Sequence, residues 1–255
     1  MKYELLTRRE LELINRKNMQ YPLAIAEKDY LLAVVSKIIN ESALRDKIVF
    51  KGGTAIHHCY LPQTRFSEDL DFTSIDKSIK LEEVKSVLES QDFLEVKKEY
   101  VSGATIKIER LKYSGPLGLA NSLKVEIDFL QNVALPAKNV IYRNVWGISA
   151  RANVMDVREI CAEKIRAASD RARYRDFYDL ALLFDSFKFD LSEIEALIKR
   201  KEVRKSISRE SILKNWGIAR KEKEDEFPRI YYARQVSDEE IEALLDRIDI
   251  KVNRP

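Results

Sequence analysis

The segment Arg65-Phe-Ser-Glu-Asp-Leu-Asp-Phe72 carries two aspartates, Asp69 and Asp71, separated by one apolar residue. Successive side chains of a β-strand point to opposite faces, so the two carboxylates share one face and Leu70 and Phe72 turn towards the core. Adjacent carboxylates repel each other unless a cation neutralises them, and Mg²⁺ is suited to carboxylate and phosphate oxygens. The alternative for such a pair alone is an exposed strand edge without a function.

A glycine pair, Gly52-Gly53, follows a short β-prone run at residues 47–50 and precedes a segment that can begin a helix at Thr54. Glycines lack Cβ atoms, so a phosphate can approach the backbone N–H groups at this point. Thr54 is expected close to the capping position of the helix. An ordinary strand-to-helix turn is the alternative.

A second acidic strand is expected in Lys124-Val-Glu-Ile-Asp-Phe129, where Glu126 and Asp128 share one face. Either one can supply a third carboxylate beside Asp69 and Asp71. Three carboxylates can hold two metal ions, of which one activates the attacking oxygen and the other stabilises the leaving pyrophosphate.

The chain has 255 residues, of which 34% are charged and 45% hydrophobic, as in a soluble globular protein. It contains only seven Gly and six Pro, which favours long helices. The spacing of apolar residues predicts helices over residues 24–40, 54–60, 81–90, 156–173, 176–186, 191–201 and 238–248, and strands over 70–73, 94–100, 104–113 and 122–129. The prediction is an α+β domain over residues 1–150, followed by a helical domain over residues 151–255.

No stretch approaches the roughly 20 apolar residues that cross a bilayer, and the N-terminus does not resemble a signal peptide. The expected location is therefore the cytoplasm, without a membrane partner. Cys59 and Cys161 belong to no ligand motif and are expected to be buried. The only histidines, His57 and His58, are adjacent and poorly placed to bind one ion together, so one is expected to be buried and the other solvated.

Residues 199–221 contain nine Lys and Arg but only two acids, Glu202 and Glu210. Such a run can contact the phosphates of RNA, although a solvated helix face has the same composition. Trp216 and the pair Tyr231-Tyr232 can stack on unpaired bases or belong to the core.

Gly-Gly-Thr, a spacer, Arg-x-Ser-x-Asp-x-Asp and a later acidic strand resemble the polymerase-β-like nucleotidyltransferase superfamily. More narrowly, the chain resembles the AbiEii/AbiGii toxins of type IV toxin–antitoxin systems. Three further segments match that branch: Glu27-Lys-Asp-Tyr30, Glu163-Lys164 and Arg171-x-x-x-Arg-Asp-x-x-Asp-Leu180. The resemblance is collinear from about residue 20 to about residue 190 and fades beyond.

The resemblance implies an N-terminal nucleotidyltransferase domain with a mixed sheet and a helical domain that completes the nucleotide pocket. It further implies Mg²⁺-dependent transfer of a nucleoside monophosphate from an NTP, with two Mg²⁺ ions. The implied acceptor is a tRNA 3′ end or another RNA, the result is growth arrest, and a cognate antitoxin is a possible partner.

The resemblance also implies residue roles. Asp69, Asp71 and Lys164 would be catalytic, together with Asp128 or Glu126. The metal ligands would be Asp69, Asp71 and Asp128. The nucleotide would be bound by a set drawn from both halves of the chain: Gly52, Gly53, Thr54, Arg65, Ser67, Lys164, Asp176 and Asp179.

Each role in the second half has a structural alternative. If residues 156–173 form one helix, Lys164 and Arg171 share a face and can reach phosphates. Lys164 can instead be a surface lysine whose stem covers apolar side chains. Asp176 and Asp179 can simply cap a helix that begins there.

Two alternatives to RNA modification stay open from the sequence. In one, the same chemistry acts on a small molecule or on a protein hydroxyl. In the other, the chain is a non-catalytic, nucleic-acid-binding regulator with its carboxylates on the surface.

Overall fold

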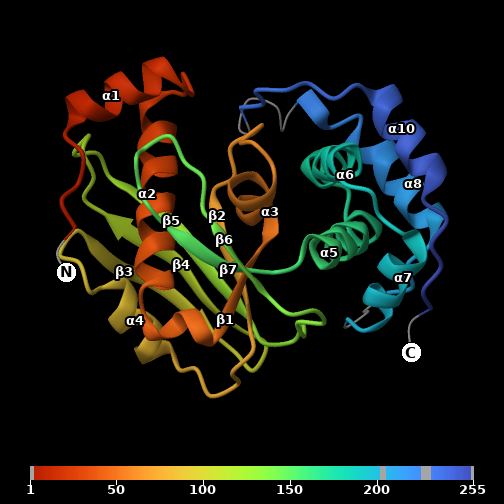
Figure 1. Ribbon diagram of the computed structural model, residues 1–255, viewed down its shortest axis with the longest axis horizontal. Helices are drawn as coiled ribbons and strands as arrows, with labels where there is room; N and C mark the ends of the chain where they lie inside the picture. The colour runs from red at the N-terminus through yellow and green to blue at the C-terminus, as the bar shows by residue number, and fades with distance from the viewer. Residues whose placement is uncertain (1–2, 202–204, 225–230, 254–255) are drawn as a thin grey trace. The chain divides into compact units, whose positions relative to one another are not determined.

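The computed structural model describes residues 3–201, 205–224 and 231–253. The chain divides into two compact units, which are described separately. The first comprises Met1–Pro62, Phe66–Val133 and Ala137–Val154, and the second comprises Gln63–Arg65, Ala134–Pro136 and Met155–Pro255. The predicted α+β class is confirmed, since the first unit contains a mixed sheet with helices and the second is built from helices (Figure 1).

In the described residues, seven strands of the first unit form one sheet in the order β3-β4-β5-β2-β1-β7-β6. The pairs β2–β5 and β1–β7 are parallel and the others are antiparallel. The strands are β1 (Ile48–Lys51), β2 (Asp69–Ser74), β3 (Leu94–Val101), β4 (Thr105–Tyr113), β5 (Asn121–Asp128), β6 (Lys138–Ile141) and β7 (Arg151–Val154).

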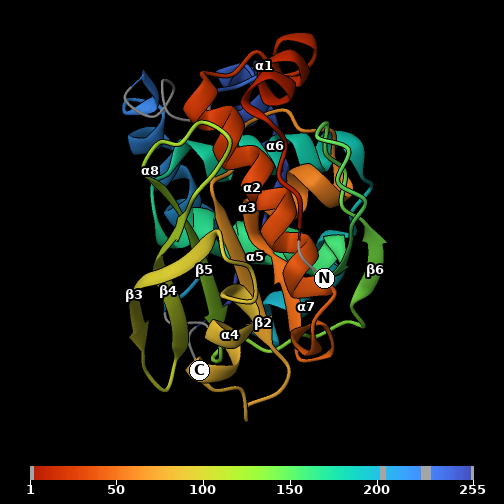
Figure 2. The same ribbon diagram turned by 90° about the vertical axis from the view of Figure 1, so that its left-hand side faces the viewer.

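One face of this sheet is apolar and covered. Leu70 and Phe72 of β2 are buried, as are Val125 and Ile127 of β5, which confirms the alternation predicted for both strands. The long helix α2 (Leu23–Asn40) contacts β2, β5 and β7, and Figure 2 shows it lying across the sheet. The opposite face of β2 and β5 carries the acidic side chains.

Helix α2 forms over the range that the apolar spacing predicts. Pro22 occupies its N-cap position, where the missing backbone N–H has no cost, and the helix is buried along most of its length. Two shorter helices pack against it: α1 (Arg8–Lys17), which Thr7 and Glu10 cap reciprocally, and α4 (Leu81–Leu88).

The segment after β1 differs from the prediction. Helix α3 (Gly52–Ala55) begins at Gly52, and the N-cap residue is Lys51, so Thr54 lies inside the helix and its expected capping position was wrong. A wider π-type turn, η2 (Ile56–Tyr60), continues the chain. Both His57 and His58 are fully buried because η2 turns both side chains inward, so the prediction that one would be solvated was also wrong.

The described helices of the second unit are α5 (Val157–Asp170), α6 (Tyr174–Ser186), α7 (Leu191–Lys199), α8 (Arg209–Ala219) and α10 (Asp238–Arg247). Helix α10 begins with a capping box between Ser237 and Glu240. Helix α5 ends earlier than predicted, because the backbone at Arg171 is extended (φ −148°, ψ 152°). Arg171 therefore does not continue the face of the helix that carries Lys164.

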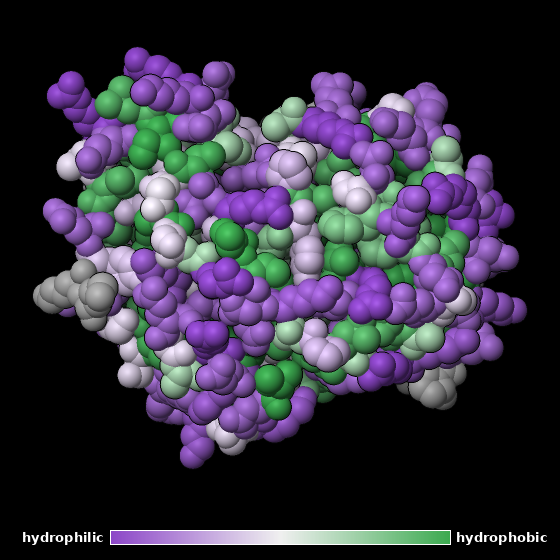
Figure 3. Space-filling view, viewed as in Figure 1, coloured by the Kyte–Doolittle hydropathy of each residue, from purple (hydrophilic) through white to green (hydrophobic). Residues whose placement is uncertain are grey.

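Cys59 and Cys161 are buried and free, as predicted. Trp216 is also buried and packs on Phe177 with ring centroids 5.3 Å apart, so it belongs to the core of the second unit. Hydrophilic side chains cover most of the face shown in Figure 3, and hydrophobic ones form small separate patches. Among the described helices, none combines the length and apolar character needed to span a membrane.

Candidate active site

Asp69 and Asp71 lie on the polar face of the sheet, and both are half-buried. The pairing of β1 with β2 puts Lys51 opposite Asp71. The pairing of β2 with β5 puts Glu126 beside Asp71 and Asp128 beside Thr73. Neighbouring strands are roughly 5 Å apart, so these side chains form two adjacent rows on one face.

Gly52 is required by the close approach of Asp71. Its backbone has φ +78°, and a Cβ atom at this position would lie 2.5 Å from Asp71 Oδ2. Any larger residue would be strained and would displace the carboxylate. The sequence pointed to this glycine, although for its openness to phosphate, and the structure adds a second reason for it.

Thr54 links α3 to the strand of the aspartates. Its buried hydroxyl donates to the carbonyl oxygen of Asp69 (2.5 Å) and hydrogen-bonds with the hydroxyl of Ser67 (3.0 Å). These bonds hold Ser67, two residues before β2, and Asp69, the first residue of β2, against the turn that contains the glycine pair. Thr54 and Ser67 therefore position the backbone that carries Asp69.

The two candidates for the third carboxylate have different surroundings. Asp128 accepts hydrogen bonds from the backbone N–H groups of Leu130 (2.8 Å) and Gln131 (3.2 Å), and its other oxygen lies 3.2 Å from Lys51 Nζ. Glu126 instead forms an ion pair with Lys107 at 3.1 Å, in which about 40% of each side chain is exposed. Exposed ion pairs contribute only about 0–1 kcal/mol to stability. Glu126 can therefore leave Lys107 and bind a metal ion at a lower cost than Asp128 can leave its partners.

Lys51 is a residue of this region that the sequence analysis missed. It is largely buried, lies in the same row as Asp71 and contacts Asp128. A buried lysine among carboxylates supplies a resident positive charge close to the glycine pair. The signal for it was a lysine placed directly before Gly52 in an otherwise apolar, β-prone run.

The second unit gathers the other predicted residues into a buried ionic cluster. Lys164 Nζ lies 2.9 Å from Asp176 and 2.7 Å from Asp179, and both carboxylates are fully buried. Arg65 binds Asp179 with two hydrogen bonds of 2.7 and 2.8 Å. Arg171 binds Asp176 at 2.8 Å from its extended position after α5.

Both structural alternatives for these residues are wrong. Lys164 is not a surface lysine, since only 11% of its side chain is exposed. Asp176 and Asp179 are not caps, because α6 begins at Tyr174 with Arg173 at the N-cap position and both acids lie within the helix. Their carboxylates instead neutralise three cations.

The ionic cluster shifts the pKa of two of its members, Asp176 and Arg65. Burial would raise the pKa of Asp176, but the charges of Lys164 and Arg171 outweigh it and lower the pKa from 3.8 to about 2. Burial would lower the pKa of Arg65, but the Asp179 carboxylate outweighs it and raises the pKa of the guanidinium above its usual value. The Asp176 carboxyl therefore stays ionised at neutral pH, and the Arg65 guanidinium stays charged.

The predicted site residues thus form two groups. Gly52, Gly53, Thr54, Ser67, Asp69, Asp71, Glu126 and Asp128 lie in the first unit, and Arg65, Lys164, Asp176 and Asp179 lie in the second. Within the described residues, no three His, Cys, Asp or Glu side chains are arranged to hold a metal ion by themselves.

Half of the described cations in the basic run at residues 199–221 are engaged in ion pairs. Its partnered cations are Lys199 with Glu195, Lys201 with Glu159 and Glu163, Arg209 with Asp246 and Arg220 with Glu242. Its exposed members include Arg200, Lys205, Lys214 and Lys221. Glu202 and Arg204 lie outside the described residues.

The fold occurs in a solved nucleotidyltransferase toxin, MenT4 from Mycobacterium tuberculosis H37Rv. The two structures match with a TM-score of 0.62 at 19% sequence identity, over 94% of this chain and 99% of that chain. At this identity the likeness shows the fold, which is that of a nucleotidyltransferase toxin. A comparison with curated proteins finds no match.

The sequence profile of one family, described as nucleotidyl transferase AbiEii toxin of type IV toxin–antitoxin systems, matches residues 34–253. The chain belongs to this family, which confirms the resemblance seen in its motifs. It is a nucleotidyltransferase and the toxin of a type IV toxin–antitoxin system. The family uses an NTP and a divalent metal, and it implies a cognate antitoxin.

Proposed function

We propose that this toxin transfers a nucleoside monophosphate from an NTP to the 3′ end of a tRNA in a Mg²⁺-dependent reaction in the cytoplasm. The observation that carries the proposal is the pair Asp69 and Asp71 on one face of β2, with Asp71 against the backbone of Gly52. The alternative of a non-catalytic regulator is set aside, since the family consists of enzymes.

The donors of the first unit suit Mg²⁺. They are hard carboxylate oxygens, and Mg²⁺ is usually held by one or two carboxylates together with substrate phosphates and water. A three-carboxylate cage is therefore not needed before the NTP binds. When bound, the metal would supply positive charge at the phosphates that react.

We propose Glu126 rather than Asp128 as the third carboxylate that joins Asp69 and Asp71, with two Mg²⁺ bound in the presence of NTP. Glu126 is the register neighbour of Asp71, and its exposed ion pair with Lys107 is easily given up. Asp128 is held by Lys51 and by two backbone N–H groups, which indicates a role in fixing the end of β5.

The remaining site residues are proposed to bind and orient the NTP. Gly52 and Gly53 present the backbone N–H groups at the start of α3 to the triphosphate, and Thr54 and Ser67 fix the turn that carries them. Lys164 is proposed to neutralise phosphate charge. Asp176 and Asp179 hold its side chain, and Arg65 in turn fixes Asp179; this restraint reduces the reorganisation required during the reaction.

The choice of RNA as acceptor is supported by the toxin family and by the exposed cations that remain in residues 199–221. These cations are fewer than the sequence suggested, because four others are paired. A small molecule or a protein hydroxyl is the competing acceptor.

The test is incubation of the purified protein with each labelled NTP, Mg²⁺ and total RNA, followed by mapping of the labelled product. We expect label at the 3′ end of tRNA. Asp69→Asn and Asp71→Asn should keep the unfolding temperature of the wild type and lose transfer by at least about a thousand-fold. Label on protein or on a small molecule would refute the RNA acceptor, and near-wild-type rates in both variants would refute the active site.

A further inference from the structure

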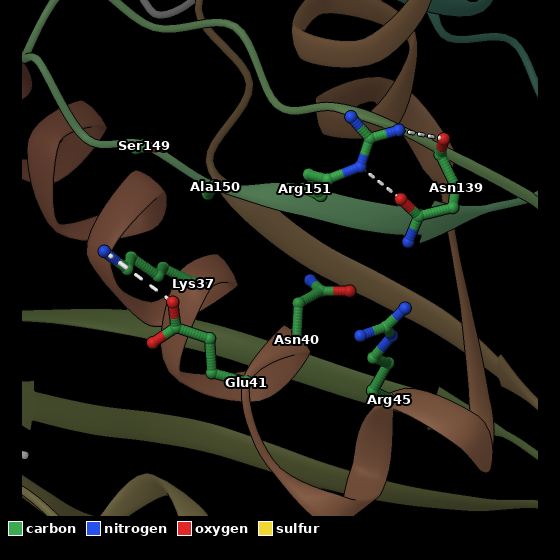
Figure 4. A pocket seen from close by; sticks show the side chains of 8 residues that line it. All are labelled: Lys37, Asn40, Glu41, Arg45, Asn139, Ser149, Ala150 and Arg151. Carbon is green, nitrogen blue, oxygen red and sulfur yellow. Dashed lines mark hydrogen bonds and ion pairs between the residues drawn. The ribbon is translucent and has the colours of Figure 1, made fainter.

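The first unit contains a polar pocket of about 250 Å³ that the proposed reaction does not use. It lies at the C-terminal end of α2, between Lys37 and Glu41 of that region, Arg45 of the following 3₁₀ turn, and Asn139 and Arg151 of β6 and β7 (Figure 4). All of these residues belong to the same unit.

The pocket is separate from the carboxylates. Val154 of β7 pairs with Phe50 of β1 in parallel, so Arg151 lies three residues before that level and Gly52 lies two residues beyond it. At about 3.3 Å for each residue, Arg151 and Gly52 are roughly 16 Å apart along the strands.

The lining of the pocket carries a surplus of positive charge. It contains three cations, Lys37, Arg45 and Arg151, and one carboxylate, Glu41. The carboxylate is already engaged, since Lys37 Nζ lies 3.7 Å away and the Tyr3 hydroxyl donates to it at 2.7 Å. The positive charges of Arg45 and Arg151 therefore exceed the negative charge in the pocket. This excess favours a negatively charged ligand.

The side chain of Arg151 and the backbone of Arg45 are held by neighbouring asparagines. Arg151 donates through Nε to the side chain of Asn139 and through Nη2 to the Asn139 carbonyl oxygen (2.6 Å), as Figure 4 shows. The backbone at Arg45 is fixed because its carbonyl oxygen accepts from Asn153 Nδ2 (3.3 Å). The planar guanidinium group matches the oxygens of a phosphate better than a lysine does.

We propose that this pocket binds a phosphate group, either a phosphodiester of an RNA backbone or a free phosphate. The pocket has the size of such a group together with its attached sugar or water, and seven of its eight lining residues have polar or charged side chains, whose aliphatic stems also line it. Binding of an RNA phosphodiester rests on the proposed function, in which RNA is the acceptor. Binding of a free phosphate does not depend on it. If the ligand is RNA, the pocket binds its backbone and orients the acceptor without touching the reacting atoms.

The test compares the wild type with the double variant Arg45→Gln/Arg151→Gln. The matched control is Lys97→Gln/Lys98→Gln, which removes two exposed positive charges from the edge strand β3. The probes are a tRNA pool, followed by fluorescence anisotropy at several KCl concentrations, and inorganic phosphate, followed by calorimetry. Metal-dependent NTP binding is measured for every variant and should not change.

We expect the arginine variant to bind tRNA about ten-fold more weakly, with a salt dependence reduced by about two in slope, while the control is unchanged. Loss of inorganic phosphate binding without a change in tRNA binding would assign the pocket to a free phosphate. An equal loss of tRNA affinity in both double variants, or no loss for either probe, would overturn the proposal. Failure of the wild type to bind tRNA would refute the RNA acceptor, and the phosphate titration would still decide the pocket.

Discussion

The Asp71 carboxylate occupies the space in which a side chain at residue 52 would begin, with Oδ2 2.5 Å from the position of a Cβ atom. The backbone of Gly52 also has φ +78°, which side chains rarely tolerate. Position 52 is thus restricted twice, by its backbone conformation and by the side chain that it must accommodate. A single methyl group tests both restrictions.

Gly52→Ala should lower the free energy of unfolding by about 2–4 kcal/mol, since the left-handed backbone and the overpacking each cost about 1–2 kcal/mol. Nucleotide transfer should be lost as well, because the Asp71 carboxylate is displaced. Gly103→Ala is the control, because a Cβ there meets no atom within 4 Å. Urea denaturation and the transfer assay measure both effects, and equal behaviour of the two variants would contradict the role of Gly52.

Glu126 and Asp128 should separate in their effects. Glu126→Gln should fold as the wild type does, because the ion pair of Glu126 with Lys107 is exposed and contributes little stability. It should lose Mg²⁺-dependent NTP binding, because Glu126 is the proposed third carboxylate. Asp128→Asn should lose about 1–3 kcal/mol of stability, because it removes the charged carboxylate that Lys51 contacts at the end of β5, and should retain most of the NTP affinity. Calorimetric titration with a non-hydrolysable NTP checks this. The reverse pattern would make Asp128 the metal ligand.

Lys51 should act as a resident counter-charge for the acidic face. Lys51→Met should lower the unfolding temperature in EDTA, and Mg²⁺ should restore more stability to this variant than to the wild type, because the ion supplies the missing positive charge. Lys107→Met serves as the control, since its ion pair with Glu126 is exposed. If Lys51→Met is destabilised equally with and without Mg²⁺, Lys51 stabilises the fold by packing alone and not by balancing the charge of the carboxylates.

The alternation of β2 and β5 was predictable because each strand has one covered face. Leu70 and Phe72 had to be buried, and this placed Asp69 and Asp71 on the other face. The register between the strands was not predictable, since both Glu126 and Asp128 satisfy the same alternation. Only the observed pairing of Glu126 with Asp71 distinguishes them.

Helix α1 was missed although Thr7 and Glu10 form a capping box in front of it, and the other missed elements were short or had a weak signal. Strands β6 and β7 have four residues each, too few to show a period, and polar and apolar residues are poorly segregated around α8, so its helical spacing is weak. The ionic cluster was missed for another reason. Arg65 is more than a hundred positions from Asp179, so no local pattern shows that Lys164 and both aspartates are buried together.

The ionic cluster should make stability depend on pH in the acid range. Asp176 has a pKa of about 2 in the folded protein and an ordinary pKa of 3.8. A lowered pKa stabilises the fold above the ordinary value, and this stabilisation is lost as the pH falls from about 4 towards about 2. Its size is about 2 kcal/mol, since each pKa unit corresponds to about 1.4 kcal/mol.

Asp176→Asn should be less stable than the wild type by about 3–5 kcal/mol at neutral pH, because Lys164 and Arg171 lose a buried partner. The difference between the two proteins should shrink by about 2 kcal/mol between pH 5 and pH 2, because the wild type loses its ionised carboxylate over that range. Asp246→Asn, which breaks the exposed pair with Arg209, is the control and should stay within about 1 kcal/mol of the wild type throughout. Urea unfolding across this range measures all three proteins. A constant difference between Asp176→Asn and the wild type would mean that the Asp176 carboxylate gains no charge stabilisation from Lys164 and Arg171.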